Sequence, residues 1–174
     1  EKLYTPIRNL TYEQCKQLRY TEGHEALGHY AKVASFEDFI RICSQYGLTA
    51  YPTIREEYLD EVIPELVRIL KKYHMLYRSI INCCDYEPLV QLHAYEPRLV
   101  MTNTRGEERG VVTLEDIQQT LALENSGVTL FYREGFSEEN PEVSITREAL
   151  EYARQMEVPI FIGFVYTPEI YSQM

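Results

Sequence analysis

The sequence lacks a basic surplus and long apolar runs, and each absence excludes a class of function. Its 17 lysines and arginines are outnumbered by 27 acids, which gives a formal net charge of -10. Nucleic acids and anionic membranes bind basic surfaces, so this balance argues against direct binding to either. No apolar run approaches the length that spans a bilayer. We therefore expect no nucleic-acid partner, no membrane association and no signal peptide.

The four cysteines lack the spacing of a metal site or a disulfide framework. They stand at Cys15, Cys43, Cys83 and Cys84, and no two of them form a CxxC pair. Cys83 and Cys84 are adjacent, so they cannot form an ordinary bridge with each other. This pattern is typical of reduced, buried thiols, and it predicts a cytoplasmic protein.

Tyrosine is abundant where tryptophan is absent, with 15 tyrosines among 174 residues. Apolar residues make up 45% of the chain, which is enough for an ordinary globular core. Tyrosine is amphipathic and suits half-buried surfaces and contact patches. Together with the acidic charge, this composition indicates a surface that binds another protein. If electrostatic attraction selects that partner, the partner is basic.

Residues 1–96 read as a mostly helical region. Ser35 opens a capping-box pattern, and Thr53 is expected to cap a second, longer helix that extends to about Tyr73. The apolar run over residues 75–84 continues as another helix. Prolines at 88 and 97 interrupt residues 85–97, which makes this stretch the best candidate boundary.

Residues 97–174 read as a small α/β region. A hairpin is predicted over residues 99–113, followed by a helix that begins at Thr113. Strands are predicted at 128–132 and 159–166, with a helix that begins at Ser144 or Thr146 between them. Strand, helix and strand in this order indicate a right-handed parallel unit. We therefore expect an α+β protein, in which a helical N-terminal half packs on a small mixed-sheet α/β C-terminal half and the two can share one core.

The stretch from His24 to His29 carries the strongest metal-site pattern. It matches HExxxH, one residue longer than the HExxH motif of zinc enzymes. Five residues turn a regular helix by about 140°, so the two rings converge only if the helix bulges, which Gly28 permits. The stretch resembles the HExxGH motif of the dipeptidyl peptidase III family. That resemblance implies a zinc hydrolase with His24 and His29 as ligands, Glu25 as general base and a later glutamate, best placed at Glu57, as third ligand.

The same stretch also fits an ordinary helix without metal. Zinc peptidases of this type lay an antiparallel sheet before the active-site helix, and only about 20 residues precede His24. In this interpretation Glu25 is solvated, His29 packs beside Tyr30, and the protein needs no cofactor.

A second candidate site begins at Gly110. The pair Thr113 and Asp116 resembles the Thr-x-x-Asp step of a CBS module, which implies binding of a nucleotide's ribose and phosphate. The alternative is a helix capping box, in which Thr113 and Asp116 satisfy backbone amides.

The third candidate is the acidic loop over residues 134–143. It surrounds Phe136 with acids that include Glu138 and Glu139, and an aromatic anchor of this kind suits a basic partner. The leading hypothesis is therefore an acidic intracellular binding or regulatory protein that acts through protein–protein contacts, without catalysis. A zinc-dependent hydrolase and, more weakly, a nucleotide-sensing domain are the alternatives.

Overall fold

The computed structural model describes residues 6–19, 32–54, 59–104, 110–133, 135–137 and 139–163. The chain divides into two units, Glu1–Gly47 and Leu48–Met174. The first unit contains a 3-10 turn η1 (Ile7–Asn9) and the helices α1 (Tyr12–Gln17) and α2 (Phe36–Gln45). The Ser35 hydroxyl accepts a hydrogen bond from the Asp38 amide at 3.0 Å, which confirms the predicted start of α2.

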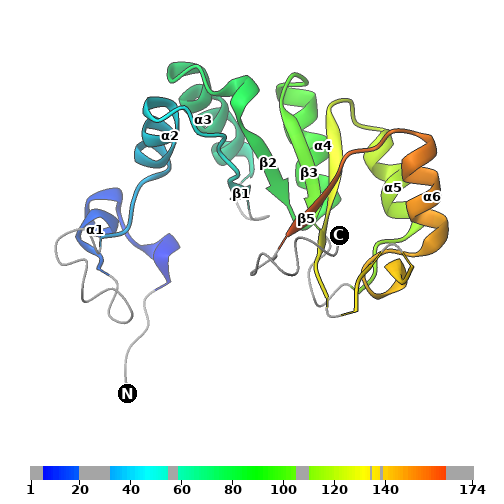
Figure 1. Ribbon diagram of the computed structural model, residues 1–174. Helices are drawn as coiled ribbons and strands as arrows, with labels where there is room; N and C mark the ends of the chain where they lie inside the picture. The colour runs from blue at the N-terminus through cyan, green and yellow to red at the C-terminus, as the bar shows by residue number, and fades with distance from the viewer. Residues whose placement is uncertain are drawn as a thin grey trace. The chain divides into compact units, whose positions relative to one another are not determined.

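The second unit is built on five parallel strands that alternate with helices. The strands are β1 (Thr53–Ile54), β2 (Ile80–Cys83), β3 (Val100–Thr104), β4 (Ser126–Phe131) and β5 (Ile160–Gly163). The helices are α3 (Leu59–Lys72), α4 (Tyr86–Tyr95), α5 (Leu114–Leu121) and α6 (Arg147–Gln155), with 3-10 turns η3 (Leu76–Arg78) and η5 (Pro141–Val143). The order of the strands in the sheet equals their order in the sequence (Figure 1).

This strand order assigns the two faces of the sheet to different roles. Right-handed crossovers that always step in the same direction place every connecting helix on one face. On that face Val128 and Leu130 of β4 pack with Ile117 of α5 and Ala149 of α6 in a buried cluster. The strand residues that alternate with them, such as Gly127 and Thr129, belong to the opposite face.

The predicted architecture is wrong, because the sheet is all-parallel and extends into the half that was expected to be helical. β1 and β2 both lie before residue 97, and they pair in parallel with Thr53 opposite Asn82. Residues 75–84 form η3 and β2 instead of a helix. A strand buried on both faces is a continuous apolar run, which periodicity does not separate from a buried helix.

Two further local predictions fail for identifiable reasons. Residues 86–95 form α4, since Pro88 lies in the first helical turn, where its missing amide costs no helical hydrogen bond. The predicted hairpin is absent from the described residues around it, because β3 pairs in parallel with β2 and β4, and Val112 bridges in parallel to Ile145. In the part of the chain that the structure describes, no helix is long and apolar enough to cross a membrane.

Candidate functional site

A cavity of about 440 Å³ lies on the sheet face that the helices leave open. Thr53, Asn82, Thr104 and Thr129 line it, and the register pairs Thr53 with Asn82 and Thr104 with Thr129. Paired residues of neighbouring strands share a face, so this wall crosses four strands. The cavity reaches the carboxyl ends of the strands, which is where parallel α/β folds bind ligands.

Asn82 ties three strands of this wall together. Its amide nitrogen Nδ2 donates to Thr53 Oγ1 at 3.1 Å, and its Oδ1 accepts a short hydrogen bond from the Thr104 hydroxyl. The Asn82 residue is buried, whereas Thr53 is exposed. The buried amide therefore holds the Thr53 hydroxyl at the surface of the cavity.

Thr129 organises the other side of the wall. Its Oγ1 lies 2.7 Å from the Tyr51 hydroxyl and 2.5 Å from Thr102 Oγ1. Thr102 and Thr129 are buried, and Tyr51 is 40% exposed. The hydrogen bond to Thr129 thus fixes the phenol of Tyr51 at the rim, with one edge open to solvent.

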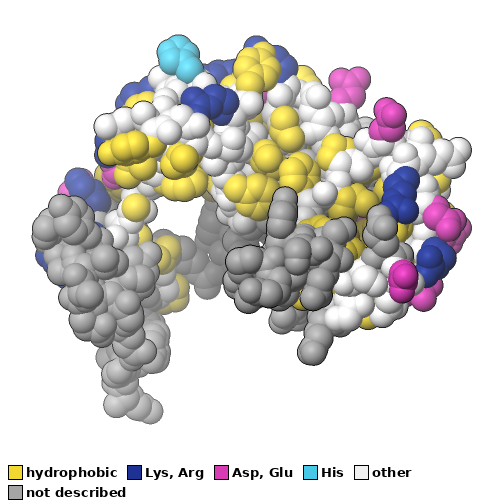
Figure 2. Space-filling view, in the orientation of Figure 1, with side chains coloured by type: hydrophobic (Ala, Val, Ile, Leu, Met, Phe, Trp, Pro, Cys, Tyr) yellow, Lys and Arg dark blue, Asp and Glu magenta, His cyan; other side chains and the backbone are white. Residues whose placement is uncertain are grey.

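The described lining is free of acids and bases. Its remaining members are apolar or weakly polar: Cys84, Phe131, Phe161, Ile162 and Gly163. In Figure 2, hydrophobic and uncharged side chains lie in the middle of the view, and acidic and basic side chains lie over α6 at its margin. Among the described residues, no three histidine, cysteine, aspartate or glutamate side chains come together as metal ligands would. The described wall can therefore orient a ligand by hydrogen bonds, but it offers no carboxylate or imidazole as general base.

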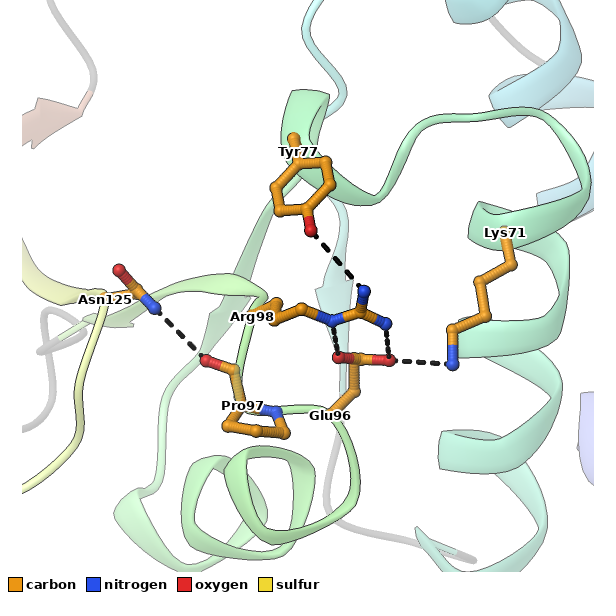
Figure 3. A network of polar contacts seen from close by, with 6 residues as sticks. All are labelled: Lys71, Tyr77, Glu96, Pro97, Arg98 and Asn125. Carbon is orange, nitrogen blue, oxygen red and sulfur yellow. Dashed lines mark hydrogen bonds and ion pairs between the residues drawn. The ribbon is translucent and has the colours of Figure 1, made fainter.

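The strongest charged cluster lies at the amino end of β3 instead. The side chain of Glu96 is only 5% exposed, and its carboxylate accepts two hydrogen bonds from Arg98 (Figure 3). It also forms an ion pair with Lys71, whose Nζ lies 2.7 Å from Glu96 Oε2. Arg98 in turn donates to the Tyr77 hydroxyl at 3.4 Å. These hydrogen bonds, from Arg98 first and then from Lys71, lower the pKa of Glu96 to about 2. The cluster joins α3, η3 and the segment between α4 and β3, so its role is structural.

The predicted metal ligands lie outside the described residues. His24, Glu25, His29 and Glu57 all belong to segments that the structure does not describe, and so does Glu138. The four cysteines, all of which the structure describes, form no disulfide bond. The wall of threonine and asparagine side chains was not predicted from the sequence, because these residues are neutral and form no motif. The available signal was the two-residue spacing of Thr102 and Thr104 and the single polar residue Asn82 within the apolar run 80–83.

The acidic loop is described in part. Phe136 is partly buried against the cluster beneath α5 and α6, and its ring meets that of Tyr132 edge to face, with centroids 6.4 Å apart. The Glu139 backbone carbonyl accepts a hydrogen bond from Arg147 at 3.0 Å. Binding of a partner by Phe136, Glu138 and Glu139 stays a prediction.

Thr113 and Asp116 form a complete capping box. The Asp116 carboxylate accepts hydrogen bonds from the Thr113 amide at 2.8 Å and from the Thr113 hydroxyl at 2.9 Å, and Asp116 is buried. The Thr113 hydroxyl accepts from the Asp116 amide. Both side chains are thus engaged in starting α5, and this local chemistry accounts for the resemblance to a nucleotide-binding step.

Asp116→Ala is expected to lower the free energy of unfolding by about 1–2 kcal/mol, the usual cost of a lost helix cap. The change also removes the carboxylate that accepts the hydrogen bond of the Thr113 amide. Glu115→Ala removes an exposed acid from the same helical turn and serves as the control. Urea unfolding followed by circular dichroism measures both. Equal stability of the two variants would show that the capping box contributes nothing.

Two solved structures are similar to this chain in fold. One is a "putative glycerophosphodiester phosphodiesterase" from Galdieria sulphuraria, with a TM-score of 0.75 and 17% identity over 97% of this chain and 64% of its own. The other is a "putative glycerophosphoryl diester phosphodiesterase" from Silicibacter pomeroyi DSS-3, with a TM-score of 0.60 and 14% identity over 80% of this chain and 48% of its own. No protein-family model and no curated protein matches the sequence.

These comparisons correct the functional hypotheses. Both similar structures bear the names of hydrolases, which contradicts a non-catalytic binding or regulatory protein that acts through protein–protein contacts. They give no support to a zinc hydrolase or to a nucleotide-sensing domain, and we abandon all three. At such low identity the likeness establishes the fold alone. The chain therefore has a TIM-barrel-like α/β fold, and it spans 64% and 48% of the two similar chains.

Proposed function

We propose that this chain is part of a phosphodiester hydrolase with a barrel-like fold, and that its ligand binds in the cavity at the carboxyl ends of the strands. The observation that carries the proposal is the cavity wall at that edge of the sheet, which is formed by Thr53, Asn82, Thr104 and Thr129. The fold that holds this wall is similar to two structures named as glycerophosphodiester phosphodiesterases. Hydrolase sites in such folds occupy this edge. The reduced state of the four cysteines supports a cytoplasmic location as part of the same proposal.

The proposed reaction adds water across one P–O bond of a glycerophosphodiester and releases glycerol phosphate and an alcohol. In phosphoryl transfer the protein mainly positions the reactants and stabilises charge on the phosphoryl oxygens. The uncharged wall of the cavity supplies positioning, through the Tyr51 and Thr53 hydroxyls and the Asn82 amide. The described lining residues hold no charge, so we assign them no step in proton transfer.

The test is release of glycerol phosphate from glycerophosphodiesters by the purified chain, with Mg²⁺ in one arm and EDTA in the other, since divalent cations often neutralise phosphoryl charge. We expect turnover above that of a heat-denatured sample. Tyr51→Phe should lower kcat/KM about 3- to 10-fold, the effect of one lost hydrogen bond. Tyr95→Phe, on α4 and 53% exposed, is the matched control.

Two outcomes would overturn the proposal. Absence of turnover in both arms from a chain that is folded by circular dichroism would remove the reaction. If neither Tyr51→Phe nor Tyr95→Phe changed kcat/KM, the reaction would have to take place outside this cavity.

A further inference from the structure

We infer that the rim formed by the amino ends of the strands is an interface between two copies of this chain. The residues that carry this inference all belong to the unit Leu48–Met174. They lie in the segments that lead into β2, β3, β4 and β5, and the amino ends of parallel strands meet at one edge of a sheet. This amino-end rim lies opposite to the carboxyl ends that border the candidate cavity, so the interface is separate from the proposed hydrolase site.

The half of the amino-end rim before β2 and β3 is basic. Lys71 and Lys72 end α3, and Arg98 lies just before β3. All three are exposed, whereas Glu96 is buried in ion pairs with Arg98 and Lys71. One carboxylate thus meets three cations, and the exposed surface stays positive. In Figure 2, lysine and arginine side chains are prominent over α3 at the top of the view.

The half of the amino-end rim before β4 and β5 is acidic. Glu124 and Glu157 are exposed and line a second cavity of about 410 Å³, and none of its described lining residues is basic. The last residue of α5, Leu121, lines the same cavity, and the last turn of α5 holds no basic residue. The carboxyl end of this helix therefore adds partial negative charge to the acidic half.

The basic and acidic halves form one continuous surface. Asn125 lines the second cavity, and its Nδ2 donates a hydrogen bond to the Pro97 carbonyl at 3.2 Å, beside Arg98 (Figure 3). A two-fold axis between the two halves would bring the basic half of each copy onto the acidic half of the other. Two-fold interfaces are self-complementary in this way.

Tyr77 supplies an anchor for this interface, and the second cavity supplies a place for it. Tyr77 is 69% exposed, and its hydroxyl accepts a hydrogen bond from Arg98 at 3.4 Å, which holds the ring beside the basic side chains (Figure 3). The second cavity exposes Leu121 and Met156, at 37% and 46%. Tyrosines that enter apolar pockets are frequent hot spots of protein interfaces. In the paired arrangement, Tyr77 of each copy enters the second cavity of the other.

A second copy fits the amino-end rim better than a polyanion does. A nucleic acid or an anionic membrane would be attracted to Lys72 and repelled by Glu124 and Glu157, whereas a second copy pairs both signs of charge. The net charge of -10 on each copy opposes association at low ionic strength. At about 0.15 M salt, charges more than about 8 Å apart are screened, so the contacts within the interface prevail.

Sedimentation velocity of the purified chain at 0.15 M salt, from about 1 to 100 μM protein, measures the association. We expect a monomer–dimer equilibrium that shifts to dimer as the concentration rises. Tyr77→Ala should raise the dimer Kd at least about 10-fold, as the loss of an interface hot spot does. Tyr51→Ala removes a tyrosine that is 40% exposed at the carboxyl-end cavity, and it should leave the dimer Kd unchanged.

Charge reversal tests whether the two halves face each other. Lys72→Glu and Glu157→Lys each place like charges in contact, twice in a two-fold dimer, so each should raise the dimer Kd about 10-fold. An equimolar mixture of these two variants restores opposite charges at both contacts, so the mixed dimer should form with a Kd about 10-fold lower than either variant alone. Arg147→Glu reverses an exposed charge at the start of α6, away from the amino-end rim, and is the control for Lys72→Glu.

Four results would overturn the inference. They are a wild-type protein that stays monomeric over the whole range, a dimer whose Kd Tyr77→Ala and both reversals leave unchanged, and a mixture that associates no better than its components. The fourth is a monomeric wild type that cosediments with phosphatidylserine vesicles and not with phosphatidylcholine vesicles. That result would assign the basic half to an anionic membrane.

Discussion

Replacing Gly127 with alanine is expected to lower the free energy of unfolding by roughly 2–4 kcal/mol, at or above the usual cost of overpacking a buried position. A Cβ atom at this position would lie 2.6 Å from the Pro159 carbonyl oxygen and 2.9 Å from Phe161 Cε2. Pro159 O accepts the hydrogen bond of the Val128 amide at 2.9 Å, so it cannot retreat without loosening the pairing of β4 with β5. The absence of a side chain at Gly127 is therefore what lets these two strands approach.

Gly163→Ala is the matched control for this experiment. Gly163 also lies in a strand of the same sheet, but the nearest described atoms to its added Cβ are 3.8 Å away. Alanine there should be neutral or stabilising by up to about 1 kcal/mol, because it restricts the unfolded chain. Urea unfolding curves of the two variants measure the difference. If Gly127→Ala were as stable as Gly163→Ala, the contact of β4 with β5 would have to be looser than described.

Local chemistry is the part of this fold that the sequence predicts well. Ser35 and Thr113 were each expected to begin a helix, as was either Ser144 or Thr146, and the side chains of Ser35, Thr113 and Thr146 accept hydrogen bonds from amides in the first turns of α2, α5 and α6. The cap predicted at Thr53 is wrong, because Thr53 lies in β1 and α3 begins at Leu59. The unit of strand, helix and strand formed by β4, α6 and β5 was also expected and is parallel. All of these depend on residues within one or two elements of each other, where short-range patterns suffice.

The sheet and its site depend on pairings that no short pattern contains. Thr53 lies opposite Asn82 although 29 positions separate them in the sequence, and Tyr51 reaches Thr129 over 78. Residues 75–84 look helical in isolation, and only the neighbouring strands decide that four of them form β2. The wall of the cavity is likewise made of neutral residues from four strands, so no charge pattern or motif in the sequence predicts it.

Glu96→Gln is expected to lower the free energy of unfolding at neutral pH by roughly 1–3 kcal/mol, less than the full cost of breaking a buried ion pair. The glutamine keeps the shape of the side chain but loses the charge that holds Arg98 and Lys71. Both cations are about half exposed, at 54% and 51% for their side chains, so water solvates them when the carboxylate is gone. This exposure limits the decrease in the free energy of unfolding.

The pH dependence tests the cause of that loss. The pKa of Glu96 is about 2 in the folded protein, against an ordinary value of 4.5. A carboxyl with a lowered folded pKa stabilises the protein above its unfolded pKa, and this stabilisation disappears as the pH falls from about 4.5 towards 2. The stability difference between wild type and Glu96→Gln should therefore be largest above about pH 5 and shrink steadily below it.

The control is Glu65→Gln, which removes an exposed partner of Arg68 on α3. Exposed pairs of this kind contribute little, so this variant should resemble the wild type at every pH. Urea unfolding between pH 3 and 7 measures both substitutions. A constant difference between wild type and Glu96→Gln across this range would mean that the glutamine disturbs packing, and that the charge of Glu96 does not hold α3 to the start of β3.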